Sequence, residues 1–345
     1  MVATRTLTRR QLNRALLARQ LLLERAGAPL PRALERMGGL QAQYAPAMYI
    51  GLWSRVEWLQ RNDLTDALQR RRVVQGTLLR ATIHLVSARD YWPFALAVRE
   101  PRRAWLLRVS RDGLTAEEVE HAAARLHESF VDGPLRRADI DRLLDPRLRG
   151  AVGLWLDLVR VPPSGTWERR RADLYAPARD WLGPPTVDAA TGLDVLVRRY
   201  LGGFGPATRA GLADWAGVPV TMLTASLDRM RLRRFRAEDG AELLDLPGAP
   251  LPDPRTPAPV RFLPTWDATL LVHARRTGIL PEEYRARVFS VKTPHSVNTF
   301  LVDGAVAGTW RYEDGRIATE EFAPLPASVR HEVADESERL AAFHA

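Results

Sequence analysis

The chain contains no cysteine and only one lysine among its 345 residues. The missing thiols exclude disulfides, thiolate zinc sites, thiol nucleophiles and cysteine-ligated iron–sulfur clusters. A chain without disulfides is typical of the cytoplasm, where we expect this protein. Schiff-base catalysis needs an amine, and Lys292 is the only lysine side chain that could supply one.

Long apolar runs are missing as well. The leucines at positions 21–23 are bounded by Gln20 and Glu24, and no segment reaches the ~18 uncharged apolar residues that a membrane-spanning helix needs. The basic N-terminal segment is not followed by the apolar stretch of a signal peptide. We therefore expect a protein that is neither secreted nor inserted in a membrane.

Motifs that hold metals or nucleotides are also absent. The seven histidines are scattered, without the His-x-x-x-His spacing of a catalytic metal site. No Gly-x-Gly-x-x-Gly or Gly-Lys phosphate-binding sequence occurs, and we interpret residues 202–205, Gly-Gly-Phe-Gly, as a turn into a helix. We expect no metal and no cofactor.

Arginine is abundant, since 49 of the 50 Lys and Arg residues are arginine and the net charge is +9. This charge fits a polyanionic partner through long-range attraction and counterion release, although a GC-rich coding bias also favours arginine. The content of 46% hydrophobic and 26% charged residues is ordinary for a globular protein with two or three cores.

Two or three amphipathic helices followed by strand-like runs recur along the chain. This pattern predicts an α+β fold, with three tandem winged-helix units followed by a small antiparallel β domain and a C-terminal helix. The predicted domains are 1–110, 111–188, 189–248 and 249–345. Residues 247–259 contain six prolines and predict an extended linker between the last two domains.

Turn signals place the expected hairpins. Residues 159–161 and 166–171 flank Pro162-Pro163-Ser164-Gly165 and predict the wing of the second unit. In the third unit, Gly217 and Pro219 separate two helices in a helix-turn-helix spacing, and Asp239-Gly240 predicts a hairpin. After the linker we expect strands at 288–291, 299–302, 305–310 and 316–317, and a helix over 328–343.

The tripeptide Gln41-Ala42-Gln43 is the most distinctive candidate for a site. Gly39 before it and Pro46 after it favour an extended chain, in which residues i and i+2 point the same way. Both amides would then converge on one water or phosphate. The alternative is a polar loop whose side chains cap their own backbone.

A predicted strand over residues 77–86 follows in the same unit. Its alternation places Leu79, Ala81, Ile83 and Leu85 on one face, and Arg80, Thr82 and His84 on the other. The three polar side chains are candidates for catalytic support or phosphate contact. A half-buried histidine bonded to backbone is the alternative for His84.

These motifs together resemble the winged-helix DNA glycosylase family of AlkZ and YcaQ. The resemblance rests on Gln-x-Gln, on Arg-x-Thr-x-His at 80–84, on Leu-Pro-Thr-Trp-Asp at 263–267 and on residues 301–310, and it spans nearly the whole chain. It implies a monomeric, nucleoid-associated enzyme that hydrolyses the N-glycosidic bond of alkylated purines in double-stranded DNA. It further implies that Gln41 and Gln43 are catalytic, and that members with Gln-x-Gln serve in self-resistance to alkylating or crosslinking natural products.

The chemistry of amides agrees with this implication. A carboxamide positions a water but is no base at neutral pH, so the substrate must be intrinsically labile. A purine alkylated at N7 is cationic and leaves as a neutral base. With one lysine, distant in sequence from the Gln motif, we expect a monofunctional glycosylase without lyase activity.

Contacts to DNA are expected from basic residues on wings and helix ends, although such clusters are often only solvated surface. The candidates are Arg169, Arg170, Arg171, Arg229, Arg231, Arg233, Arg234, Lys292, His295 and Asn298. Four aromatic residues, Trp53, Trp58, Tyr91 and Trp92, are expected to pack in the core of the first unit.

Two alternatives stay open. A winged-helix transcriptional regulator would need base-reading side chains on its recognition helix, and residues 219–228 offer no Arg, Asn or Gln. A non-catalytic DNA-binding protein fits the same fold and differs only in activity.

Overall fold

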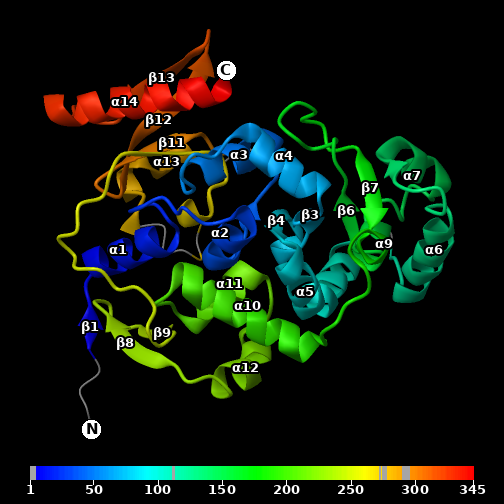
Figure 1. Ribbon diagram of the computed structural model, residues 1–345. Coiled ribbons are helices and arrows are strands. Elements are labelled where there is room, and N and C mark those ends of the chain that lie inside the picture. Colours follow the sequence, from blue (N-terminus) through cyan, green and yellow to red (C-terminus); the bar gives the residue numbers. More distant parts are fainter. Residues whose placement is uncertain (1–4, 111–112, 272, 274–277, 290–295) are drawn as a thin grey trace.

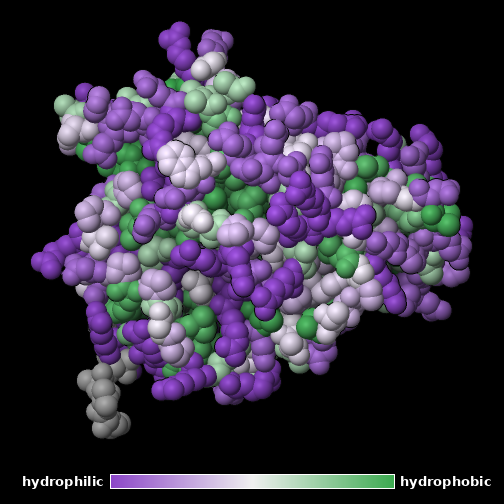
Figure 2. Space-filling view, viewed as in Figure 1, coloured by the Kyte–Doolittle hydropathy of each residue, from purple (hydrophilic) through white to green (hydrophobic). Residues whose placement is uncertain are grey.

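The computed structural model describes residues 5–110, 113–271, 273, 278–289 and 296–345. Helices and mostly antiparallel sheets are mixed along the chain (Figure 1), so the predicted α+β class is confirmed. Within these ranges no helix is long and apolar enough to cross a membrane. Hydrophilic side chains cover most of the face shown in Figure 2, and apolar ones show mainly in hollows between them.

The N-terminal part contributes one half of a six-stranded antiparallel sheet with the order β2-β4-β3-β6-β7-β5. Its elements are β1 (Thr6–Leu7), α1 (Arg9–Arg19), α2 (Leu30–Met37), β2 (Leu40–Gln41), α3 (Ala45–Trp53), α4 (Arg61–Gln69), β3 (Val73–Thr77), the 3-10 turn η1 (Leu79–Ala81), β4 (Ile83–Ser87) and α5 (Ala88–Val109). The long helix α5 begins at Ser87, whose side chain accepts a hydrogen bond from the backbone N–H of Asp90.

The next part supplies the other half of this sheet. Its elements are α6 (Ala116–Glu128), β5 (Leu135–Arg136), α7 (Arg137–Leu143), α8 (Val152–Trp155), β6 (Leu158–Arg160), β7 (Leu174–Pro177) and α9 (Ala178–Leu182). Helix α6 begins with a capping box, in which the side chains of Thr115 and Glu118 each accept the other's backbone N–H. Strands β3 and β6 pair at Gln75 with Arg160 and at Gly76 with Val159. One sheet therefore crosses the boundary predicted at residue 110, and the division into domains stays a prediction.

The third part contains the expected helix-turn-helix and hairpin. Its elements are α10 (Ala189–Phe204), α11 (Arg209–Ala216), η2 (Val220–Leu223), α12 (Thr224–Asp228), β8 (Arg233–Ala237) and β9 (Glu242–Asp245). The predicted turn at 202–205 is wrong for Gly202, Gly203 and Phe204, which lie inside α10. Gly203 is needed for close packing, because a Cβ there would lie 2.5 Å from the carbonyl oxygen of Met37.

The C-terminal part is a four-stranded antiparallel sheet, β10-β11-β12-β13, with a covering helix. Its elements are β10 (Arg261–Leu263), η3 (Ala268–Leu270), η6 (Glu282–Tyr284), α13 (Arg285–Val288), β11 (Thr299–Val302), β12 (Ala305–Glu313), β13 (Arg316–Glu321) and α14 (Ala327–His344). The antiparallel β domain and the final helix are confirmed, and Asp303-Gly304 and Asp314-Gly315 form the turns that join β11, β12 and β13. The strand predicted from 288 is wrong at Val288, which ends α13, and residues 290–291 lie outside the described chain.

Two predicted strands are also wrong in their bounds. The run 77–86 is a hairpin, because Arg80 and Ala81 have positive φ angles of 51° and 55° and reverse the chain between β3 and β4. In the second wing β6 pairs with β7 at 174–177, and the predicted strand 166–171 is a loop. The first error comes from a turn that is built by residues other than Gly.

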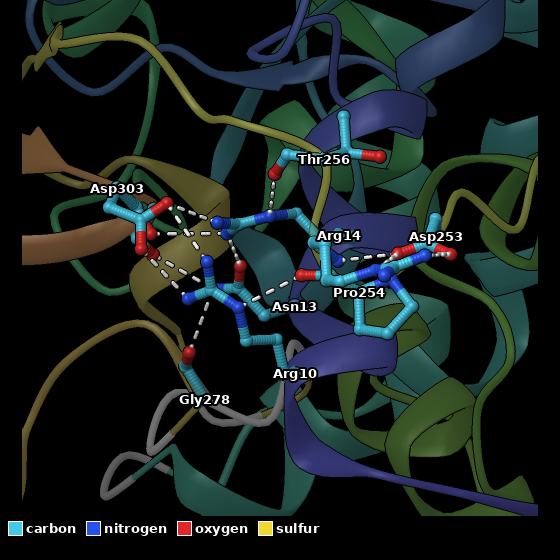
Figure 3. A network of polar contacts seen from close by, with 10 residues as sticks. Arg10, Asn13, Arg14, Asp253, Pro254, Thr256, Gly278 and Asp303 are labelled. Atoms are coloured by element: carbon cyan, nitrogen blue, oxygen red, sulfur yellow. Dashed lines mark hydrogen bonds and ion pairs between the residues drawn. The ribbon is translucent and has the colours of Figure 1, made fainter.

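A polar network joins the first helix to the C-terminal sheet (Figure 3). Arg10 and Arg14 of α1 both bond to the Asp303 carboxylate, at the turn between β11 and β12. Asn13 donates to the carbonyl oxygens of Gly278 (2.9 Å) and Gly304 (2.8 Å). The sheet is thereby held against α1, in the same N-terminal part of the chain as the Gln motif.

Candidate active site and nucleic-acid interface

The Gln motif begins where α2 ends. Gly38 and Gly39 both have positive φ, and a Cβ on Gly39 would lie 2.9 Å from Cγ1 of Val86 and 3.1 Å from the carbonyl oxygen of Leu85. Glycine therefore lets the chain reverse and press β2 directly against β4. This contact fixes the register of the motif.

Strand β2 pairs antiparallel with β4, and Gln41 lies opposite His84. The backbone N–H of Ala42 continues the pairing by donating to the carbonyl oxygen of Ile83 (2.8 Å). Directly opposed residues present their side chains on the same face, so Gln41 and His84 are neighbours. The extended conformation expected for the motif is confirmed at Gln41, whereas Gln43 lies in a bend beyond β2.

Each amide oxygen of the motif accepts a hydrogen bond from the hairpin. Arg80 Nη2 donates to Oε1 of Gln41 (3.0 Å), and the backbone N–H of Ile83 donates to Oε1 of Gln43 (3.1 Å). Gln41 is half-buried and Gln43 is exposed. Neither Nε2 group donates to a partner in the described part of the chain. Gln43 thus bonds the backbone of β4 and not, as the alternative expected, that of its own loop, while both amides keep free N–H donors.

Arg80 joins the motif to the helix-turn-helix. Its Nη1 donates to the carbonyl oxygen of Trp215 in α11, while Nη2 holds Gln41. Burial lowers the pKa of Arg80 to about 10, and the Asp214 carboxylate opposes this effect. The guanidinium therefore stays charged at neutral pH and polarises the Gln41 amide.

His84 is a buried neutral imidazole. Burial first, and the charge of Arg80 second, lower its pKa to about 3. Its Nδ1 lies 3.0 Å from the carbonyl oxygen of Thr82, which can only accept, so Nδ1 carries the proton. The Thr82 hydroxyl in turn donates to the carbonyl oxygen of Leu79 (3.0 Å). The structure therefore places Arg80 and His84 beside the Gln motif, whereas Thr82 bonds within its own turn.

A cleft opens beside the hairpin turn at Ala81. One hollow, of about 670 Å³, lies between the turn, α5 and the connection from α11 to η2. A second, of about 390 Å³, lies between α5, α7, α8 and the β6–β7 pair. Ala81 and Trp105 line both hollows, which we call together the Trp105 cleft.

The Trp105 cleft gathers arginines that lack carboxylate partners. Those without an ion pair, among all residues placed in the structure, are Arg80, Arg108, Arg149 and Arg160. The Nε atoms of Arg149 and Arg160 are buried without a hydrogen-bond partner, and Asp214 is the one acidic side chain lining either hollow. Arg80, Arg149 and Arg160 are half-buried, and Arg108 is exposed beside them. Partial burial of a guanidinium group without a carboxylate is costly, so this arrangement indicates a site for anions.

Several arginines expected to contact DNA are instead engaged with carboxylates. Arg229 forms an ion pair with Asp194 (2.6 Å), and Arg234 forms one with Glu242. Arg233 lies over the ring of Phe235, and Arg231 is exposed. The structure does not bring this group into the Trp105 cleft.

The second predicted group lies closer to the Gln motif. Arg169, Arg170 and Arg171 are exposed on the loop before β7. Arg170 Nη1 donates to the hydroxyl of Tyr44, the residue after Gln43, at 3.4 Å. This loop therefore lies beside the motif and extends the basic surface around it.

The third predicted group can be placed only in part. Lys292 and His295 lie outside the described residues. Asn298 uses Oδ1 to accept the backbone N–H of Thr265 (2.9 Å) and so supports the loop after β10. Where the structure describes the chain, no three His, Asp or Glu side chains group as metal ligands.

Sequence reasoning missed Arg108, Arg149 and Arg160. They come from α5, the segment before α8, and β6, and the pairing of β3 with β6 brings their elements together. No short-range pattern marks them. The expected core packing of Trp53, Tyr91 and Trp92 is confirmed, but Trp58 is 89% exposed and that prediction is wrong.

Comparisons with known proteins agree with this geometry. The family described as DNA glycosylase AlkZ-like matches residues 34–343. The structure of Streptomyces sahachiroi DNA glycosylase AlkZ superposes with a TM-score of 0.80 at 19% identity, covering 99% of this chain and 97% of that one. No curated protein is similar enough in sequence to match.

Proposed function

Because the chain belongs to the AlkZ-like DNA glycosylase family, we propose that it hydrolyses the N-glycosidic bond of N7-alkylated purines in duplex DNA. One observation carries this proposal. Gln41 and Gln43 stand beside Arg80 and a neutral His84, so the groups gathered there can hold a water but not deprotonate it.

Such a site suits a substrate that is already activated. N7 alkylation gives the purine a positive charge, and cleavage of the bond to C1′ returns the bonding electrons to the ring and neutralises it. Water then adds to C1′ and loses its proton to solvent. Positioning the water lowers the entropic part of the barrier, while an unmodified guanine would also need an acid.

The residues divide this task. The free Nε2 of Gln41 or Gln43 donates to the water oxygen, and the remaining lone pair of either Oε1 accepts one of its protons. Arg80 fixes the orientation of Gln41, because it is itself anchored on the carbonyl oxygen of Trp215. His84 packs beside Gln41 as a neutral side chain and does not donate a proton to the leaving base.

Binding of the duplex would rest on the unpaired arginines of the Trp105 cleft and on Arg170 beside the motif. Their guanidinium groups can each form two hydrogen bonds to a phosphate. The helix-turn-helix and the hairpins fit three winged-helix units arranged around one duplex. A sequence-specific regulator is less well supported, since α12 has five residues and the following Arg229 is ion-paired.

Excision by water predicts an intact strand with an abasic site. The test incubates the purified protein with duplexes carrying N7-methylguanine, bulky N7 adducts or an interstrand crosslink, and measures strand breaks before and after alkali. We expect breaks only after alkali, no borohydride-trapped complex, and the same product from Lys292→Ala. Release no faster than the spontaneous rate across all substrates would overturn the proposal.

The range of adducts also bears on biology. Fast release of bulky or crosslinked adducts would support a role in self-resistance to an alkylating natural product. Release of small methyl adducts alone would instead support general repair of alkylated DNA.

A further inference from the structure

Trp105 is presented to solvent between the two hollows of its cleft. It lies near the C-terminal end of α5 and is 45% exposed. Its ring makes no aromatic or cation–π contact, and its indole N–H has no acceptor, within the described chain. By contrast, the indole N–H groups of Trp92 and Trp310 donate to carbonyl oxygens. Trp105 therefore offers an exposed part of its ring for stacking and a free donor.

The space beside Trp105 suits a nucleotide. The larger hollow, of about 670 Å³, falls within the roughly 300–1,000 Å³ of typical small-molecule sites. Arg108 is exposed on the same helix one turn away, and Arg149 and Arg160 line the other side. An aromatic ring flanked by guanidinium groups is the usual arrangement for binding single-stranded nucleic acid.

The charge of the cleft decides which base it takes. Arg80, Arg102 and Arg108 line the larger hollow against Asp214 alone, and Arg102 is already paired with Asp157. A cationic N7-alkylated purine would be repelled there, whereas a neutral base with its phosphate would be attracted. The occupant is therefore an undamaged nucleotide rather than the lesion.

We propose that the Trp105 cleft binds an unpaired, undamaged nucleotide of the DNA, with its base stacked on Trp105 and its phosphate held by Arg108 or Arg149. This inference rests on the proposed function only in taking DNA as the partner. Arg80 lines the cleft and also holds Gln41, so the nucleotide would lie next to the lesion in the distorted duplex.

The test measures binding of undamaged DNA, so no excision step enters. Three duplexes with identical flanks are compared: one fully paired, one with a single unpaired adenine, and one whose extra residue is an abasic analogue. Stacking contributes about 1–3 kcal/mol, so the wild type should bind the unpaired adenine about 5- to 150-fold more tightly than either control. Equal affinity for all three would overturn the inference.

Matched variants assign the preference to Trp105. Trp105→Ala should abolish it and Trp105→Phe should keep most of it. Trp58→Ala removes a more exposed tryptophan outside the cleft and should leave it unchanged. A preference that survives Trp105→Ala contradicts the proposal. If no base is released but the preference for the unpaired adenine depends on Trp105, the proposed excision is wrong and the nucleotide site stands. If bases are released but the preference does not depend on Trp105, only the nucleotide site is wrong.

Discussion

Two arginine-rich regions of this protein differ in what their charges meet. Around α12 and β8, Arg229 and Arg234 are exposed but neutralised by Asp194 and Glu242. In the Trp105 cleft, Arg108, Arg149 and Arg160 have no carboxylate within the described structure. The first group is dense in sequence and paired in space, and the second is dispersed in sequence and unpaired in space.

We infer from this difference that the absence of a carboxylate partner indicates a DNA-binding surface better than the local density of arginines does. An exposed ion pair adds little to stability and already satisfies both charges. An unpaired guanidinium in a hollow gains most when a phosphate arrives. The position of the unpaired group next to Arg80 also links DNA binding to the Gln motif.

The largest expected effect separates chemistry from binding. Gln41→Ala with Gln43→Ala should lower the single-turnover rate of base release by about 100-fold or more, because water positioning acts at the transition state. The dissociation constant for duplex should change less than about threefold. Gln69→Ala, an exposed glutamine of α4, is the matched control. Full activity of the double variant would remove both amides from the mechanism.

A smaller effect is expected from changing Arg80, which contacts Gln41 and also lines the Trp105 cleft. Arg80→Lys keeps the charge but cannot reach Gln41 and the Trp215 carbonyl oxygen with two separate donors. We expect kcat to fall about tenfold while DNA affinity stays within about threefold. Steady-state kinetics and a binding titration check this split. A loss of affinity with kcat unchanged would assign Arg80 to the phosphate surface instead.

The smallest effect concerns pH. The pKa of His84 is lowered to about 3 in the fold, so between about 3 and its ordinary value near 6.5 the unfolded chain binds a proton that the folded chain does not. Stability should therefore fall as pH falls through this window. Denaturant unfolding of wild type and His84→Gln should show a shallower fall in the variant, by up to about 1.4 kcal/mol per pH unit. Parallel curves would contradict a neutral buried His84.

Much of the fold could be predicted from local sequence, and the hairpin at 79–82 shows where local sequence was not enough. The Thr115 capping box, the helix-turn-helix around Gly217 and the Asp-Gly turns each specify a local backbone state. The hairpin at 79–82 could not be predicted, because Arg80 and Ala81 take a left-handed conformation that favours glycine or asparagine. The pairing of β3 with β4 and the hydrogen bond from Arg80 to the carbonyl oxygen of Trp215 stabilise this conformation.

The site divides in the same way. Gln41 and Gln43 could be proposed from the sequence, because two amides at positions i and i+2 of an extended chain can converge on one water or phosphate. Arg108, Arg149 and Arg160 were missed because only the pairing of β3 with β6 brings their elements together. Pairing between distant strands, and the ion pairs that neutralise Arg229 and Arg234, depend on tertiary contacts that a single sequence does not display.

The central claim is that the unpaired arginines, and not the paired ones, hold DNA. The most direct measurement is the salt dependence of duplex affinity in two variants, one of the unpaired group, Arg108→Gln/Arg149→Gln/Arg160→Gln, and one of the paired group, Arg229→Gln/Arg234→Gln. Each lost phosphate contact lowers the slope of log affinity against log salt by about 0.9, so the cleft variant should lose about two to three units of slope and the other less than one. Equal losses, or the larger loss in the second variant, would contradict the account.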